Sequence, residues 1–125
     1  MTINEISYEI RGAIFQVYNE LGPGLLESIY QAALVYELNK RGLRVRKEVP
    51  VPVIYDGTKL DVDFRLDLLV ENRIIIELKS VEQLKKVHYK QLITYLKITS
   101  ITLGLLVNFN TDDILNSIKR IANKL

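Results

Sequence analysis

Asp67, Glu77 and Lys79 are the residues of this chain whose types and spacing could do chemistry. Three apolar residues precede and three follow the polar centre 71–73, so a three-residue turn joining two short strands is the economical interpretation. With that turn, Asp67 lies opposite Glu77, with Cβ atoms roughly 5 Å apart on one face. Period-2 alternation sends Lys79 to the same side as Glu77. Two acids and one cation are therefore expected to converge on one patch.

Such a patch suits metal-dependent cleavage of a phosphodiester bond. A hard divalent cation such as Mg²⁺ takes oxygen ligands, usually one or two carboxylates together with waters and phosphate oxygens. Asp67 and Glu77 could supply the carboxylates, with the backbone carbonyl of Leu78 as a third ligand. The ion would stabilise charge on the phosphate and lower the pKa of a bound water, while Lys79 would position that water or neutralise negative charge.

The alternative is an ordinary surface hairpin in which Lys79 pairs with one of the two acids. The run of isoleucines at 74–76 weighs against it, because a strand that is apolar on both faces is typically covered on both sides. Carboxylates at the end of such a strand lie near low-dielectric material and need a metal or a cationic partner to stay charged.

Composition restricts the classes that remain. With 125 residues and 48% hydrophobic content, the chain is expected to form one domain over residues 1–125. It has no apolar run long enough for a membrane helix and no signal-peptide pattern at its start, so we expect a soluble, cytoplasmic protein without a membrane partner. With no cysteine and the single histidine His88, any metal site within one chain must use oxygen ligands.

The formal charge of +2 is too small to indicate nucleic-acid binding by itself, but the basic residues are clustered. One cluster surrounds a predicted helix-to-strand junction, where solvated surface charge is the alternative, and the other surrounds the candidate site. Their members are Lys40, Arg41, Arg44, Arg46 and Lys47 in the first, and Lys79, Lys85, Lys86 and Lys90 in the second.

Periodicity and turn residues predict eight elements in the order ααβββαβα. The predicted helices cover residues 4–21, with Asn4 as a possible cap, residues 25–40, ending at Gly42, and residues 81–97. The predicted strands cover residues 45–55, 60–70, 73–79 and 101–107. A last helix is expected to begin near Thr111 or Asp112, with the buried stripe Ile114, Leu115, Ile118, Ile121, Ala122 and Leu125. The predicted class is α/β, with a mixed sheet flanked by helices.

Two polar residues fall on the predicted inward face of the helix at 81–97, whose apolar members are Leu84, Val87, Tyr95 and Ile98. They are His88 and Gln91, and each needs a hydrogen-bond partner if it is buried. In one interpretation they bond the sheet within the core. In the other, Gln91 and Tyr95 reach the substrate phosphate or a metal-bound water, with His88 on the same stripe.

Glu27 lies on an inward-facing line of the second predicted helix, which it shares with Tyr30, Leu34 and Leu38. A glutamate in a first turn can simply complement the helix dipole. Alternatively, it is a third acidic corner around a cation.

Four motifs in order across the chain resemble a known family. The segment from Gly24 through Glu27 to Tyr30 resembles the G-x-x-E-x-x-Y signature of the family named for it, within the PD-(D/E)XK nuclease superfamily. Asp67 resembles the first acid of that superfamily and the segment 77–79 its E-x-K motif. The segment 91–95 resembles the Q-x-x-x-Y motif of the RecB-like branch. No proline precedes Asp67, which departs from the pattern.

The resemblance implies a restriction-endonuclease-like core that hydrolyses phosphodiester bonds of nucleic acid, with DNA favoured by analogy. It implies Asp67 and Glu77 as ligands of Mg²⁺ or Mn²⁺, Lys79 as the catalytic lysine and Glu27 as an accessory acid. It also implies that Gln91 and Tyr95 contact phosphate or order the site, with possible help from His88. The alternative is a non-catalytic nucleic-acid-binding or protein-interaction module on a nuclease scaffold. A homodimer or a protein partner is compatible with either function.

Overall fold

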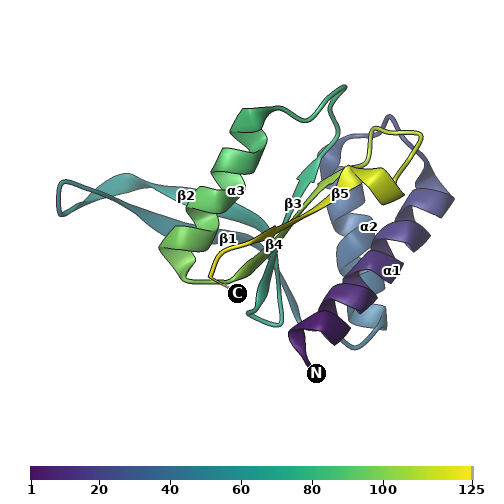
Figure 1. Cartoon of the computed structure of the whole chain (residues 1–125), viewed down its shortest axis with the longest axis horizontal. Coiled ribbons are helices and arrows are strands. Elements are labelled where there is room, and N and C mark those ends of the chain that lie inside the picture. The colour runs from purple at the N-terminus through teal and green to yellow at the C-terminus, as the bar shows by residue number, and fades with distance from the viewer. Residues whose placement is uncertain (125) are drawn as a thin grey trace.

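The computed structural model describes residues 1–124, which form one mixed sheet with helices on both faces (Figure 1). The sheet order is β1-β2-β3-β4-β5, in which β3 and β4 are parallel and the other neighbours are antiparallel. The strands are β1 (Val45–Tyr55), β2 (Thr58–Val70), β3 (Ile74–Lys79), β4 (Leu103–Asn108) and β5 (Ile118–Ala122), and the helices are α1 (Ile3–Leu21), α2 (Glu27–Lys40) and α3 (Lys86–Thr99). The predicted α/β class is confirmed.

Helices α1 and α2 pack together against one face of the sheet. Helix α1 is capped by Thr2, not by Asn4 as predicted, because Thr2 and Glu5 exchange side-chain-to-backbone hydrogen bonds in a capping box. Helix α2 ends at Lys40, and the chain turns at Gly42, as predicted, where a φ of 83° suits glycine. Within residues 1–124, no helix has both the length and the apolar content that crossing a membrane requires.

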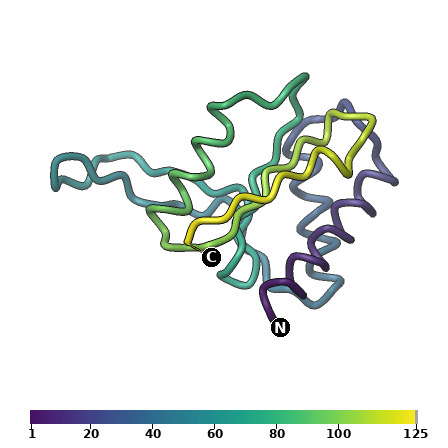
Figure 2. Tube along the Cα trace, viewed as in Figure 1, coloured from purple at the N-terminus to yellow at the C-terminus, as the bar shows by residue number. Residues whose placement is uncertain are grey.

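Both predicted hairpins are confirmed. Asp56 and Gly57 have φ values of 52° and 72° and join Tyr55 to Thr58, as a tight two-residue turn requires. At the second hairpin, Val70 pairs with Ile74 across the predicted three-residue turn. The outer part of the β1–β2 hairpin projects beyond the rest of the molecule (Figure 2).

Helix α3 forms the crossover between the parallel strands β3 and β4 on the other face of the sheet. It begins at Lys86, and residues 81–85, which were predicted to be its first turn, form a loop. The predicted inward face is wrong in part: Val87 and Ile98 are 63% and 45% exposed, whereas Tyr95 is buried and Leu84 packs against the core. The buried face carries Leu92, Tyr95 and Leu96.

The predicted last helix is also wrong. Its first part is a short 3₁₀ turn, Leu115–Ser117, and its second part is strand β5, antiparallel to β4. Because β4 is buried at all six positions, its free edge needs backbone hydrogen bonds that only another strand supplies. The β-branched Ile118 and Ile121 fit a strand, and each packs against a different core. Leu125, assigned to the predicted stripe, lies outside the described residues.

Two hydrophobic cores enclose β3. The larger lies between the sheet and helices α1 and α2 and includes Ile74 and Ile76, and the smaller lies under α3 and includes Ile75. The isoleucine run is fully buried. The expectation that this strand is covered on both faces is confirmed.

Helix α3 packs tightly against the sheet at Gly104 of β4. A Cβ atom added there would meet Leu92 Cδ1 at 2.9 Å and Cγ at 3.0 Å. We expect Gly104→Ala to lower the free energy of unfolding by about 1–3 kcal/mol through overpacking. In a Leu92→Ala background, the same substitution should cost much less, because the clashing atoms are gone. Urea unfolding of the double-mutant cycle measures this coupling, and additive effects would contradict it.

Candidate active site

The β2–β3 hairpin brings Asp67 and Glu77 together. Its register pairs Leu68 with Ile76 and, one step further, places Asp67 opposite Glu77. At this position the carboxylates of Asp67 and Glu77, rather than backbone carbonyls, accept the hydrogen bonds from the facing strand. The backbone N–H of Asp67 donates to Glu77 Oε2 at 2.9 Å, and the backbone N–H of Leu78 donates to Asp67 Oδ2 at 2.8 Å. Each carboxylate is thus fixed by the other strand and keeps a second oxygen that makes no hydrogen bond within residues 1–124.

A break in side-chain alternation explains why Asp67 reaches Leu78. Leu68 packs in the core under α1 and α2, whereas Leu66, two residues earlier, packs in the core under α3. Residues two apart in a regular strand share a face, so β2 changes faces at Asp67. Its side chain is therefore free to turn along the sheet toward the N–H of Leu78.

Burial makes both acids weak in the absence of a cation. Glu77 is only 3% exposed, and its burial, followed by the negative charge of Asp67, raises its pKa from 4.5 to about 8. Burial also raises the pKa of Asp67. The positive charge of Lys79 acts in the opposite direction on both. Glu77 therefore holds a proton near neutral pH unless a cation takes its place.

Lys79 ends β3 on the same side as Glu77 and is half-buried. Within residues 1–124, ion pairs shorter than 4 Å join only Arg41 to Glu9 and Arg44 to Glu71. The ordinary surface hairpin, in which Lys79 pairs with one of the acids, is therefore not what the structure shows. The ammonium group lies close enough to influence both acids without forming a direct pair with either.

Glu27 is brought to the end of β3 by the loop that precedes α2. The hydroxyl of Tyr30 donates to the carbonyl of Gly22 at 2.6 Å and accepts from the N–H of Leu25 at 3.1 Å, while its ring stacks on Phe109. Tyr30, Leu34 and Leu38 are buried as predicted. Glu27 itself is exposed and accepts a hydrogen bond from the backbone N–H of Ser80 at 3.2 Å.

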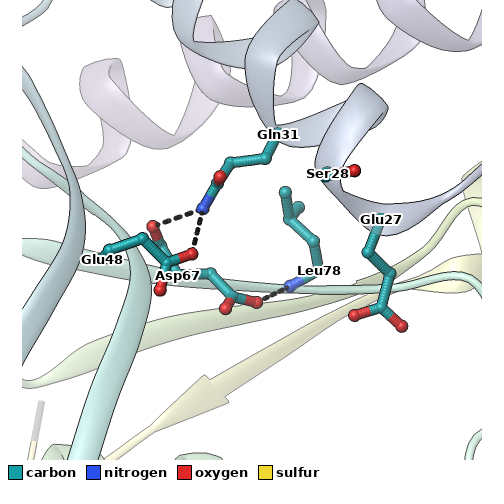
Figure 3. Close-up of a pocket in the computed structure, with 6 residues that line it drawn as sticks. All are labelled: Glu27, Ser28, Gln31, Glu48, Asp67 and Leu78. Carbon is teal, nitrogen blue, oxygen red and sulfur yellow. Dashed lines mark hydrogen bonds between the residues drawn. The ribbon is translucent and has the colours of Figure 1, made fainter.

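A cavity of about 130 Å³ lies between Glu27 and Asp67 (Figure 3). Its lining residues are Glu27, Ser28, Gln31, Glu48, Asp67 and Leu78. The carboxylate of Glu27 lies on the other side of Leu78 from Asp67 (Figure 3). Within residues 1–124, no three His, Cys, Asp or Glu side chains lie close enough to hold a metal by themselves. The acids provide two converging carboxylates with Glu27 nearby, rather than a closed cage.

The three residues of α3 that were predicted to reach the site differ in their burial. Tyr95 is buried, and after burial itself the charges of Glu77 and Asp67 are the main causes that raise its pKa, so its hydroxyl lies within their electrostatic reach. A side-chain hydrogen bond with Gln91 acts in the opposite direction. Gln91 is exposed, so its predicted inward position is wrong. His88 is half-buried, and its Nδ1 accepts a hydrogen bond from the backbone N–H of Lys85 at 3.0 Å, which is a capping role.

Sequence reasoning missed three polar residues of this region. Gln31 lies four residues after Glu27, so both lie on one side of α2, a signal that was available. Asn108 is a buried polar residue at the end of a parallel strand, where its side chain holds both the N–H and the C=O of Val81. Glu48 gave no signal in the sequence, because only the fold brings the middle of β1 to the cavity.

Comparisons with known proteins identify the superfamily of the chain. A family model for the PD-(D/E)XK nuclease superfamily matches residues 4–121, and the chain belongs to this superfamily. The mixed sheet is consistent with a restriction-endonuclease-like fold, and nucleases of this superfamily generally use divalent metal ions. No curated protein matches the chain.

The chain is similar to a solved structure titled "Crystal structure of SSO0001", with 27% sequence identity and a TM-score of 0.59. The match covers 78% of this chain and 50% of that chain, so this chain spans about half of its length.

The raised pKa of Glu77 predicts how stability changes with pH in the absence of metal. Between pH 4.5 and about 8, the folded protein keeps a proton on Glu77 that the unfolded chain has lost. The free energy of unfolding should therefore fall as pH rises through this range and then level off. Urea unfolding in EDTA at a series of pH values measures the slope.

Glu77→Gln should reduce that slope, whereas Glu20→Gln on the exposed side of α1 should leave it unchanged. A wild-type slope in Glu77→Gln would show that the pair does not titrate as described.

Proposed function

We propose that this protein is a metal-dependent nuclease that hydrolyses phosphodiester bonds, with DNA as its substrate. The observation that carries the proposal is the reciprocal pair in which Asp67 and Glu77 each accept a backbone N–H from the opposite strand, with Lys79 beside them. A buried carboxylate, Glu77, beside a half-buried one, Asp67, destabilises a fold unless a cation joins them. A divalent cation is the partner that this arrangement fits.

Mg²⁺ or Mn²⁺ fits the donor set, because every candidate ligand is an oxygen atom. Asp67 and Glu77 would hold the ion through their second oxygens. The carbonyl of Leu78 points to the same strand edge as its N–H, which faces Asp67, so it can be a third ligand. Glu27 would act as the accessory acid across the cavity. When bound, the ion supplies stabilisation of negative charge on the phosphate and lowers the pKa of water.

The chain's own groups would then orient the reaction. Lys79 places a positive charge where negative charge develops on the phosphate. Tyr95 contacts Phe64 edge to face and lies within electrostatic reach of the acids. It can donate its hydroxyl hydrogen to a phosphate oxygen or an ordered water, and Gln91 can orient that hydroxyl. Lys85, Lys86 and Lys90, at and just before the start of α3, are exposed and suit a polyanionic substrate.

The motifs around Glu27 and Tyr95 support assignment to the G-x-x-E-x-x-Y family and the RecB-like branch. By analogy with that family, they favour DNA over RNA as the substrate. We propose a cytoplasmic location separately. One site cuts one strand at a time, so the paired sites of a homodimer, or a protein partner, would suit cleavage of both strands.

Removing either charged group should abolish turnover without unfolding the protein. We expect Glu77→Gln and Lys79→Met to reduce the rate of DNA cleavage by at least about 100-fold, because each removes a charge that acts on the transition state. Lys59→Met, on the projecting hairpin, is the matched control and should cleave normally. Labelled single-stranded DNA, duplex DNA and RNA with Mg²⁺ or Mn²⁺ are the substrates.

A wild-type protein that cuts none of these substrates would overturn the nuclease proposal. If it then bound nucleic acid in a salt-sensitive manner, the result would support the non-catalytic module instead.

The hydroxyl of Tyr95 should matter for catalysis but little for folding. Tyr95→Phe keeps the edge-to-face contact with Phe64, at 5.5 Å between ring centroids, and loses only the hydroxyl. We expect kcat/KM to fall about tenfold or more, as for the loss of a hydrogen bond to a charged group. Tyr89→Phe on the same helix is the control. Equal activity in both variants would remove Tyr95 from the site.

A further inference from the structure

Glu48 is in an unusual backbone conformation for its position. Its φ is 52°, and within residues 1–124 it is the only non-glycine residue inside a strand with a positive φ. The ladder pairs Lys47 with Leu68 and Val49 with Leu66, but omits the pair between Glu48 and Asp67. A left-handed conformation costs free energy for a residue with a Cβ atom.

The backbone alone does not account for a glutamate at this position. β1 changes faces here, because Val45 packs under α1 and α2 whereas Val49 packs under α3. A left-handed residue can produce that change, but glycine or asparagine would do so with less strain. The carboxylate must therefore contribute something that these residues lack.

Gln31 holds that carboxylate at the cavity. Its Nε2 donates to Glu48 Oε1 at 2.9 Å and to the backbone carbonyl of Asp67 at 3.1 Å, so one amide ties α2 to two strands (Figure 3). Glu48 and Asp67 thus line the same cavity. Burial is the main cause of the raised pKa of Asp67 and of Glu77, and the charge on Glu48 adds to both shifts.

We propose that Glu48, held by Gln31, is a further carboxylate of the metal site and that its charge strengthens binding of the divalent cation. The inference rests on the proposed function. A negative charge beside a partly buried site attracts a dication over several ångströms, so Glu48 acts without direct coordination. The strained backbone and the added repulsion destabilise the metal-free protein, and the bound cation offsets this cost.

The test uses the full chain, freed of metal with EDTA and titrated with Mn²⁺ alone. The electron paramagnetic resonance signal of free Mn²⁺ gives the dissociation constant, and thermal unfolding gives the stability of the metal-free protein. We expect Glu48→Gln and Glu48→Asn to weaken Mn²⁺ binding by about three- to tenfold. Glu48→Asn should also unfold at the same or a higher temperature, because asparagine tolerates this conformation. Asp61→Asn removes one charge from the exposed hairpin and should change neither quantity.

The outcomes are distinguishable. Mn²⁺ binding within about twofold of wild type in both Glu48 variants would overturn this inference and leave the nuclease proposal intact. A lower unfolding temperature for metal-free Glu48→Asn with unchanged Mn²⁺ affinity would assign Glu48 to the fold alone and would also overturn it. Failure of the wild-type protein to bind Mn²⁺ would overturn the proposed function, and this inference with it.

Discussion

The exchange of hydrogen bonds between the Asp67–Glu77 pair and the facing backbone is the constraint on which the rest of the site depends. It exists only in one register of the β2–β3 hairpin, which the turn residues Glu71 and Asn72 fix by adopting left-handed conformations. A slip of one residue would move every side chain of β3 to the opposite face. The same register that buries the three isoleucines therefore also brings the two acids together.

The protein maintains this pair at the expense of stability. Helices cover both faces of β3, so Glu77 near its end and Asp67, opposite it on β2, lie against apolar material and repel each other. A fold selected for stability alone would place apolar side chains there. Nucleases of the PD-(D/E)XK superfamily, to which this chain belongs, generally use divalent metal ions, and two acids in this arrangement suit such an ion.

The helix motif divides into a structural part and a chemical part. Tyr30 is fully buried, stacks on Phe109 and fixes the loop through the carbonyl of Gly22. This packing sets where α2 begins, and hence where Glu27 and Gln31 project. The apolar core thereby positions polar groups that do not contact it.

The sequence by itself determined the elements whose signals are local: α1, α2, both hairpins, and the opposition of Asp67 and Glu77, which follows from turn length and period-2 alternation. It did not determine the last strand, because Ile114, Ile118 and Ile121 suit a helix as well as the strand that the open edge of β4 requires. It also misplaced Gln91, because the orientation of α3 is set by Leu92 against Gly104. Glu48 lies at the cavity only because α2 packs over β1 and because β1 pairs with β2, which carries Asp67. Such contacts depend on which surfaces the whole chain must bury, and no local pattern encodes them.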